Sequence, residues 1–282
     1  MNISENVVNV FPHIFNRPFI PVGIDMPLYQ FSVFLAIGPE IYVDGLIVLD
    51  KTNQRVVGRL GSKNILSHLL NKPYSEWENI TADQIMESNI DEEKIGIDTP
   101  VSKVIELFQK TRLAFAPIIK DGNVVAVLTI RDFLPIIKNN ENVDTTPISK
   151  ISSKLTTIDK NTDVLMAIGI MLKKGIRNIG ITENRNESSK VIGVVNDRSI
   201  LEFLLSHNGR QIMKKFEEKT VSHIKFTKNL RIYPINEVDH NTSTKVAANL
   251  LADMERPFLI LKGKDKIVTP WDLVIKTLNI TR

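Results

Sequence analysis

The stretch Asn123-Val-Val-Ala-Val-Leu-Thr-Ile-Arg-Asp-Phe-Leu134 indicates how this chain folds. Its apolar run from Val124 to Leu128 is mostly β-branched and is typical of a buried strand. The run passes without a spacer into Thr129-Ile-Arg-Asp132 and then into a helical pattern. The stretch therefore predicts a tight strand-to-helix turn with a hydroxyl and a carboxylate at its start.

The same order of residues occurs three more times. The fourth copy, Lys266-Ile-Val-Thr-Pro-Trp-Asp-Leu-Val274, has Thr269 and Asp272 at the polar positions. Two weaker copies have Gly61 with Asn64 and Asn196 with Ser199 at these positions. From copy to copy, the first polar position advances by 68, 67 and 73 residues. A period of this length indicates one supersecondary unit that is used four times.

Each repeat is predicted to contain a strand, a helix, two further strands and a second helix. In the second repeat, the first helix is expected where apolar residues follow the spacing of one buried face, at Val101, Val104, Ile105 and Phe108. Thr99 is its expected N-cap, as Thr162 is in the third repeat. An Asp-Gly pair predicts a hairpin turn between the strands 115–119 and 124–128.

The polar segment from Asn139 to Pro147 has almost no apolar residues and is the expected boundary between two halves. We therefore expect the first pair of repeats within 1–142 (about 1–75 and 76–142) and the second within 143–282 (about 143–213 and 214–282).

The composition is that of a soluble globular chain, with 282 residues, 43% hydrophobic and 24% charged. The absence of cysteine excludes disulfides and thiol chemistry and suits a reducing compartment. The first residues lack the pattern of a signal peptide, and no apolar run approaches the roughly 20 residues of a membrane span. A cytoplasmic location without membrane contact is expected.

These repeats resemble the CBS domains, small βαββα units that bind adenosine-containing ligands and work in pairs. The ligand signature of that family is Gly, an apolar residue, any residue, Ser or Thr, two residues, and Asp or Asn. Thr129 with Asp132 and Thr269 with Asp272 match its polar part, whereas the Gly is replaced by Ala126 and Lys266. The third repeat keeps Gly193 but departs at Asn196 and Ser199, and the first keeps Gly58 and Asn64 but has Gly61 in place of the hydroxyl. The resemblance implies an α/β (α+β) fold of four tandem CBS repeats, in two pseudo-twofold pairs packed as a disc.

The chemistry of the matching residues suits a nucleotide. A helix N-terminus and a Thr hydroxyl favour a phosphate, which assigns that role to Thr129 and Thr269. A carboxylate can accept both hydroxyls of a ribose, which assigns that role to Asp132 and Asp272. By the resemblance, the base would lie between the first-helix entry and the middle strand, against Thr99, Phe115, Ala116, Thr242, Phe258 and Leu259. The arginines expected near the phosphates are Arg131, Arg177 and Arg198.

The resulting hypothesis is a non-enzymatic sensor of adenine nucleotides. AMP is the favoured ligand, followed by ADP, ATP and S-adenosylmethionine, and the output lies on a separate effector protein. A homodimer is one option for the assembly. The five histidines have no metal-binding spacing, so no metal is expected. No phosphate loop, nucleophile elbow or catalytic carboxylate pair was found in the sequence, which argues against an enzyme.

Three other interpretations stay open. Thr-x-x-Asp before a helix is also an ordinary capping box, which needs no ligand. The protein could instead be a ligand-free scaffold or a nucleic-acid-binding adaptor that uses the basic stretch 207–231. It could also be a regulatory subunit that lies permanently against an enzyme. The basic residues of the stretch are Arg210, Lys214, Lys215, Lys219, Lys225, Lys228 and Arg231.

Overall fold

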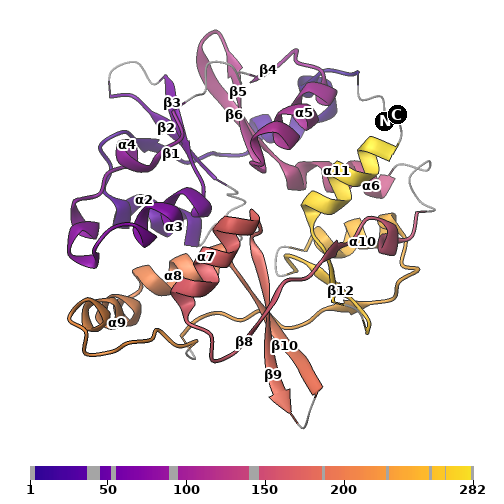
Figure 1. Ribbon diagram of the computed structural model, residues 1–282. Helices are drawn as coiled ribbons and strands as arrows, with labels where there is room; N and C mark the ends of the chain where they lie inside the picture. Colours follow the sequence, from indigo (N-terminus) through magenta and orange to yellow (C-terminus); the bar gives the residue numbers. More distant parts are fainter. Residues whose placement is uncertain are drawn as a thin grey trace.

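The computed structural model describes residues 4–36, 45–51, 55–88, 95–139, 146–185, 188–226, 229–253, 256–263 and 265–280. Four small α/β units lie around a common centre and form a flattened disc (Figure 1). The predicted fold of four βαββα repeats is therefore confirmed. Most of the polar segment expected between the halves lies outside the described residues, so the boundaries between 142 and 143 and within each half remain predictions.

Each repeat is built on one sheet with the same topology. A first strand pairs in parallel with the second, and the second pairs antiparallel with the third. The first repeat contains β1 (Pro21–Gly23), α2 (Leu28–Ala36), β2 (Leu46–Leu49), β3 (Val56–Leu60) and α3 (Ser62–Leu70). The second contains β4 (Ile95–Gly96), α5 (Val101–Thr111), β5 (Phe115–Lys120), β6 (Asn123–Thr129), the 3-10 helix η4 (Ile130–Phe133) and α6 (Leu134–Asn139).

The second half repeats this order. The third repeat contains β8 (Thr157–Asp159), α7 (Val164–Lys174), β9 (Asn178–Arg185), β10 (Ser188–Asn196) and α8 (Asp197–Leu205). The fourth contains β11 (Glu237–Val238), α10 (Thr244–Leu251), β12 (Leu259–Leu261), β13 (Lys266–Val268) and α11 (Pro270–Ile280). Short elements precede the repeats: α1 (Val7–Val10), η1 (Pro12–Asn16), η2 (Tyr74–Asn79), α4 (Ala82–Ile85), η6 (Ile148–Lys150), β7 (Ser153–Lys154) and α9 (His207–Glu217).

The predicted hairpin is confirmed, but two predicted helix caps are wrong by one residue. Asp121 and Gly122 both have positive φ, at 50° and 80°, as a two-residue hairpin turn requires. Thr99 instead accepts a hydrogen bond from the Gly96 N–H, so Pro100 becomes the N-cap of α5. In the third repeat the carboxylate of Asp163, rather than Thr162, accepts the Leu165 N–H at 2.7 Å. A carboxylate is the stronger acceptor at a helix N-terminus.

Each repeat is completed by a segment that precedes the other repeat of its pair. The first N–H of α5 donates to Glu5, and that of α2 donates to Ile80, both at 2.9 Å. The first N–H of α7 donates to Ile224 at 2.9 Å, and that of α10 to Thr146 at 3.2 Å. We call 5–17, 80–87, 146–154 and 221–233 the exchanged segments. Their reciprocal placement ties the first repeat to the second and the third to the fourth.

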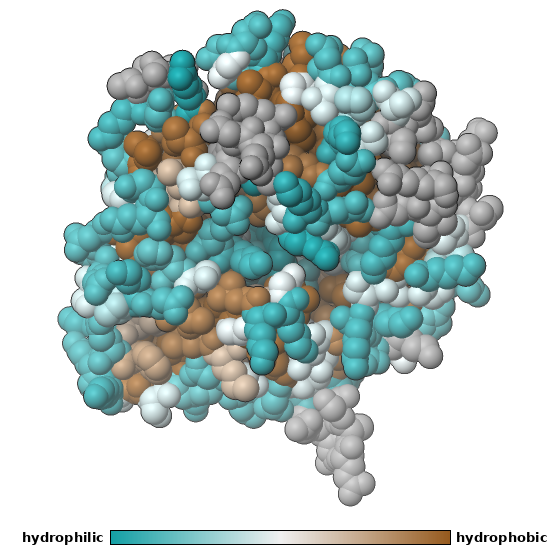
Figure 2. Space-filling model, turned by 45° about the horizontal axis from the view of Figure 1, so that its top comes forward, coloured by the Kyte–Doolittle hydropathy of each residue, from teal (hydrophilic) through white to brown (hydrophobic). Residues whose placement is uncertain are grey.

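The apolar cores follow a different pairing. One large core contains buried residues of the second and fourth repeats, another of similar size contains those of the first and third, and a small third cluster joins the third and fourth repeats. Accordingly, α6 packs against α10, α2 against α8, and α3 against α7 and α8. The exchanged segments therefore join neighbours within a half, while the helices join the halves. On the face seen in Figure 2, hydrophilic side chains surround a hollow near the middle of the disc.

Candidate functional site

The strand-to-helix turn has the same hydrogen bond in all four repeats. The side chain three residues after the first polar position accepts the backbone N–H of that position. The four pairs are Asn64 with Gly61 at 2.9 Å, Asp132 with Thr129 at 2.7 Å, Ser199 with Asn196 at 3.1 Å and Asp272 with Thr269 at 3.0 Å. The capping interpretation is thus realised at every copy, and any ligand role must coexist with it.

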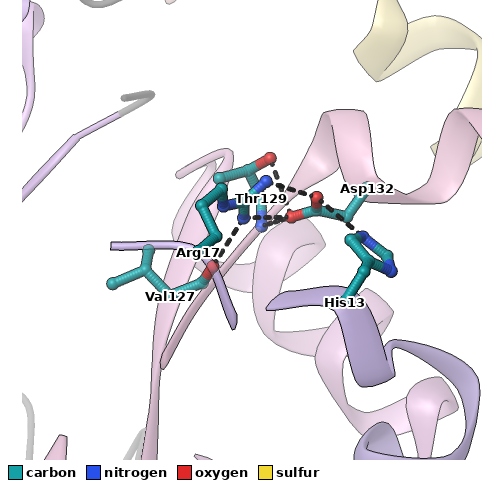
Figure 3. Close-up of polar contacts among 5 residues, drawn as sticks. All are labelled: His13, Arg17, Val127, Thr129 and Asp132. Atoms are coloured by element: carbon teal, nitrogen blue, oxygen red, sulfur yellow. Dashed lines mark hydrogen bonds and ion pairs between the residues drawn. The ribbon is translucent and has the colours of Figure 1, made fainter. Parts of the chain in front are cut away.

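At the second repeat, both oxygens of Asp132 are engaged by side chains (Figure 3). Oδ2 accepts the N–H of Thr129, its hydroxyl at 3.1 Å, and Nη2 of Arg17 at 2.9 Å. Oδ1 accepts Nη1 of Arg17 at 2.7 Å and lies 3.3 Å from Nε2 of His13. Arg17 also donates to the Val127 carbonyl at 2.9 Å. The cation that closes this turn thus comes from the exchanged segment 5–17.

This environment decides the charge state of Asp132. Its side chain is only 2% exposed, whereas that of Arg17 is 21% exposed and that of His13 is 52% exposed. Burial by itself raises the pKa of Asp132, but hydrogen bonds from His13 and Arg17, the charge of Arg17 and the Thr129 N–H together hold the pKa below its usual value. Asp132 is therefore a carboxylate at neutral pH and remains a strong acceptor.

The fourth repeat closes its turn in another way. Oδ2 of Asp272 accepts the N–H and, at 2.7 Å, the hydroxyl of Thr269. Oδ1 accepts the Ser153 hydroxyl at 2.5 Å and lies 2.8 Å from Nζ of Lys276. Lys276 is one turn further along α11, and its side chain is 38% exposed. The cation here comes from the same helix and is partly exposed, and it also donates to the Ile151 carbonyl at 2.7 Å and the Ser153 hydroxyl at 2.8 Å.

In both carboxylates, of Asp132 and Asp272, the two oxygens have different partners. In each, Oδ2 caps the helix start, while Oδ1 is held by a cation and a second side chain, His13 or Ser153. His13 and Ser153 both belong to exchanged segments. Oδ1 is therefore the atom at which a ligand hydroxyl could replace a protein donor without disturbing the cap.

The residues expected to hold the base are mostly interior. Phe115 and Phe258 are buried, and Ala116 and Leu259 belong to the core shared by the second and fourth repeats. A Cβ on Gly45 would lie 2.0 Å from Phe115, so this glycine covers the ring closely. The ring of Tyr233 meets that of Phe258 edge-on at 6.1 Å. Thr99 and Thr242 stay half-buried at the first-helix entries.

The three arginines expected near the phosphates have structural contacts. Arg131 is buried and donates to the Leu251 carbonyl at 3.0 Å, which ties η4 to α10 of the fourth repeat. Nε of Arg177 donates to Asp197 at 2.8 Å, and Arg198 is buried in the first turn of α8. The structure does not bring Arg131 or Arg177 to the carboxylate of Asp132 or Asp272.

Four residues at these turns were missed from the sequence: His13, Arg17, Ser153 and Lys276. Only Lys276 had a local signal, because it stands four residues after Asp272 on one helix. The others lie in segments outside the repeating unit, and their contacts depend on the exchange between repeats.

A groove of about 560 Å³ lies elsewhere, between α3 and η2 of the first repeat and α7 and α9 of the second half. None of the predicted ligand residues lines it. Within the described ranges, no group of three or more His, Asp or Glu side chains is placed to hold a metal. In the same part of the chain, no helix is long and apolar enough to cross a membrane.

Part of the charge of the basic stretch is engaged by other residues of the chain. The guanidinium of Arg210 lies 5.1 Å from the centre of the Tyr29 ring. Lys214 pairs with Glu218 and Arg231 with Glu202. Lys228 lies outside the described residues. These contacts agree with the interpretation of α9 as an inter-repeat helix.

Comparison with known proteins supports the same fold. Residues 82–139 and 148–206 match the model of the CBS domain. They coincide with the second and third repeats, and the first and fourth have the same topology. No curated protein matches the chain.

Among solved structures, a Methanocaldococcus jannaschii protein proposed as an archaeal homologue of γ-AMPK has a TM-score of 0.77 at 15% identity, over 95% of this chain and 98% of that chain. A conserved uncharacterised Pyrococcus horikoshii protein has a TM-score of 0.53 at 12% identity, over 83% and 91% of the two chains. A CBS domain pair solved with 5′-methylthioadenosine and S-adenosyl-L-methionine, at 21% identity and a TM-score of 0.37, spans 47% of this chain and 98% of its own. The two matched stretches are therefore CBS domains, and the four repeated sheets give the chain the fold of the Methanocaldococcus jannaschii protein.

Proposed function

We propose that this chain is a non-catalytic regulatory protein that binds an adenosine-containing nucleotide, with AMP as the first choice, at the turns of the second and fourth repeats. The observation that carries this proposal is the arrangement at Asp132 and Asp272. In both, Oδ2 is committed to the helix cap, and Oδ1 is held only by side chains that can move.

A ribose offers the donors that Oδ1 would need in exchange. Each Oδ1 has two side-chain partners, and the two hydroxyls of a ribose can take their place without leaving the carboxylate unsatisfied. The cations released from Oδ1, Arg17 and Lys276, are then beside the ligand. A phosphate on the same ligand gives them a new anionic partner.

The fourth-repeat site is the easier one to open. Lys276 makes a single contact with Asp272, and its side chain is 38% exposed, so water can hydrate the ammonium group once it is displaced. Arg17 makes two charge-assisted bonds to a buried carboxylate, each worth roughly 1.5–3 kcal/mol. We therefore expect a nucleotide to occupy Asp272 at lower concentration than Asp132.

The exchanged segments give this binding a route to an effector protein. Ser153 and Arg17 reach the carboxylates from segments that precede the other repeat of each pair in the sequence. A ligand at Oδ1 breaks these contacts and so changes how the paired repeats hold each other. Such a ligand regulates only if it binds one arrangement better than the other.

Thermal unfolding with AMP, ADP, ATP and S-adenosylmethionine tests the proposal. A ligand at 100 times its Kd should add about 2.7 kcal/mol of stability, a shift of several degrees. The shift should shrink in Asp272→Asn and persist in the matched control Asp265→Asn, whose side chain is exposed on the nearby turn. No shift with any of the four compounds at millimolar concentration would contradict the proposal.

A further inference from the structure

Arg17 holds both oxygens of Asp132, although it comes from the segment that precedes the first repeat. We infer that Arg17 determines specificity at the second-repeat site. When a ribose takes Oδ1 of Asp132, the guanidinium moves to the phosphate of the same ligand. The site thereby selects phosphorylated nucleosides over uncharged ones. This inference rests on the proposed function.

The selection follows from charge balance. Arg17 is nearly four-fifths shielded from solvent, and its partner Asp132 is buried. An uncharged nucleoside would replace Nη1 of Arg17 on Oδ1 with neutral hydroxyls, so the guanidinium would keep its Nη2 bond to Oδ2 but lose one charge-assisted bond in a poorly hydrated place. A nucleoside monophosphate brings its own anion, so the guanidinium exchanges one charged partner for another.

The backbone around Arg17 limits the movement to the side chain. Val7, Phe11 and Ile14 of the same segment have no exposed surface and belong to the core of the second and fourth repeats. The segment cannot leave without exposing them. Nη2 of Arg17 also donates to the Val127 carbonyl, which keeps the guanidinium at the end of β6 when Nη1 leaves Asp132.

His13 lies beside Arg17 at this site. Its Nε2 lies 3.3 Å from Oδ1 of Asp132, and its half-exposed ring is one helical turn from Arg17. At the fourth repeat the corresponding cation, Lys276, reaches solvent and can be hydrated when it is displaced. The same chemistry therefore predicts weaker selection for a phosphate at Asp272 than at Asp132.

Calorimetric titration of AMP and adenosine into the full chain carrying Asp272→Asn isolates the second-repeat site. With Arg17 present, AMP should bind about tenfold or more tightly than adenosine. In Arg17→Met, adenosine should bind more tightly and AMP more weakly, so that the ratio approaches one. Arg17→Lys should give an intermediate ratio, because it keeps the charge but not the paired donors.

A ratio unchanged by Arg17→Met would overturn this inference alone and leave Arg17 as a structural tie. If neither compound binds either protein, the inference falls together with the proposed function at this site. Thermal unfolding of each variant checks that it is folded. If Arg17→Met does not fold, Arg17→Gln removes the charge, keeps an amide donor for Val127 and gives the same comparison.

Discussion

The turns at Asp132 and Asp272 have the same spacing, the same cap and a cation on the same oxygen, yet they differ in where the cation comes from. Arg17 arrives from a segment 115 residues away and is bidentate. Lys276 stands one turn along the same helix and is partly exposed. The motif therefore determines which carboxylate accepts the hydrogen bonds. The residue that supplies the cation determines how readily a ligand can replace that cation on the carboxylate.

The largest expected effect is the difference in protein stability between removing Arg17 and removing Lys276. Arg17→Met leaves a buried carboxylate short of its main partner and should lower the free energy of unfolding by about 3 kcal/mol or more. Lys276→Met should cost less than Arg17→Met, because Lys276 makes one contact with Asp272 where Arg17 makes two with Asp132, and because its side chain is partly exposed. Urea denaturation of both variants measures the difference.

The double variant Arg17→Met with Asp132→Asn serves as the control for that measurement. It removes both charges, so it should recover part of the stability lost in Arg17→Met alone. If Arg17→Met and Lys276→Met lowered the free energy of unfolding equally, the two cations would stabilise their turns equally, and our account would be contradicted.

A middle-sized effect is expected at the interface between the first two repeats. Gly45→Ala places a methyl group against the Phe115 ring and should destabilise the protein by about 1–3 kcal/mol. The matched control is Gly169→Ala within α7, where an added methyl meets no other atom within 4 Å and should be neutral or stabilising. A tolerated Gly45→Ala would mean that the ring has room for a base after all.

The smallest effect concerns acid stability. The pKa of Asp132 is lower in the folded protein than in the unfolded chain, where Asp titrates near about 3.9. Its contribution is therefore complete above that pH and is lost as the pH falls toward the folded value. As the pH falls below about 4, the Asp132→Asn variant should lose less stability than the parent protein does. Identical pH profiles would show that Asp132 is not held as we describe.

The sequence predicted the repeated fold because its main signals are local. The apolar strand before Thr129, its copies and the helical periodicity of α5 all lie within short windows. The helix starts were misplaced at Thr99 and Thr162, where a neighbouring Pro or Asp competes for the cap. The capping box at Thr129 was foreseen as an alternative, and the structure shows it.

The contacts of the turns could not be read from the sequence. The bond between Arg17 and Asp132 depends on the exchange of segments between repeats, which leaves no periodic pattern near either residue. The same is true of Ser153 beside Asp272. The ligand roles of Arg131 and Phe115 stay predictions, and the sequence did not show that Arg131 reaches α10 or that Gly45 lies close to the Phe115 ring.

Calorimetric titration of AMP into the parent, Asp132→Asn, Asp272→Asn and the double variant tests the central claim most directly. We predict two sites in the parent, with the tighter one absent from Asp272→Asn, the weaker one absent from Asp132→Asn, and no binding to the double variant. AMP binding that survives in the folded double variant would place the nucleotide elsewhere and contradict the account.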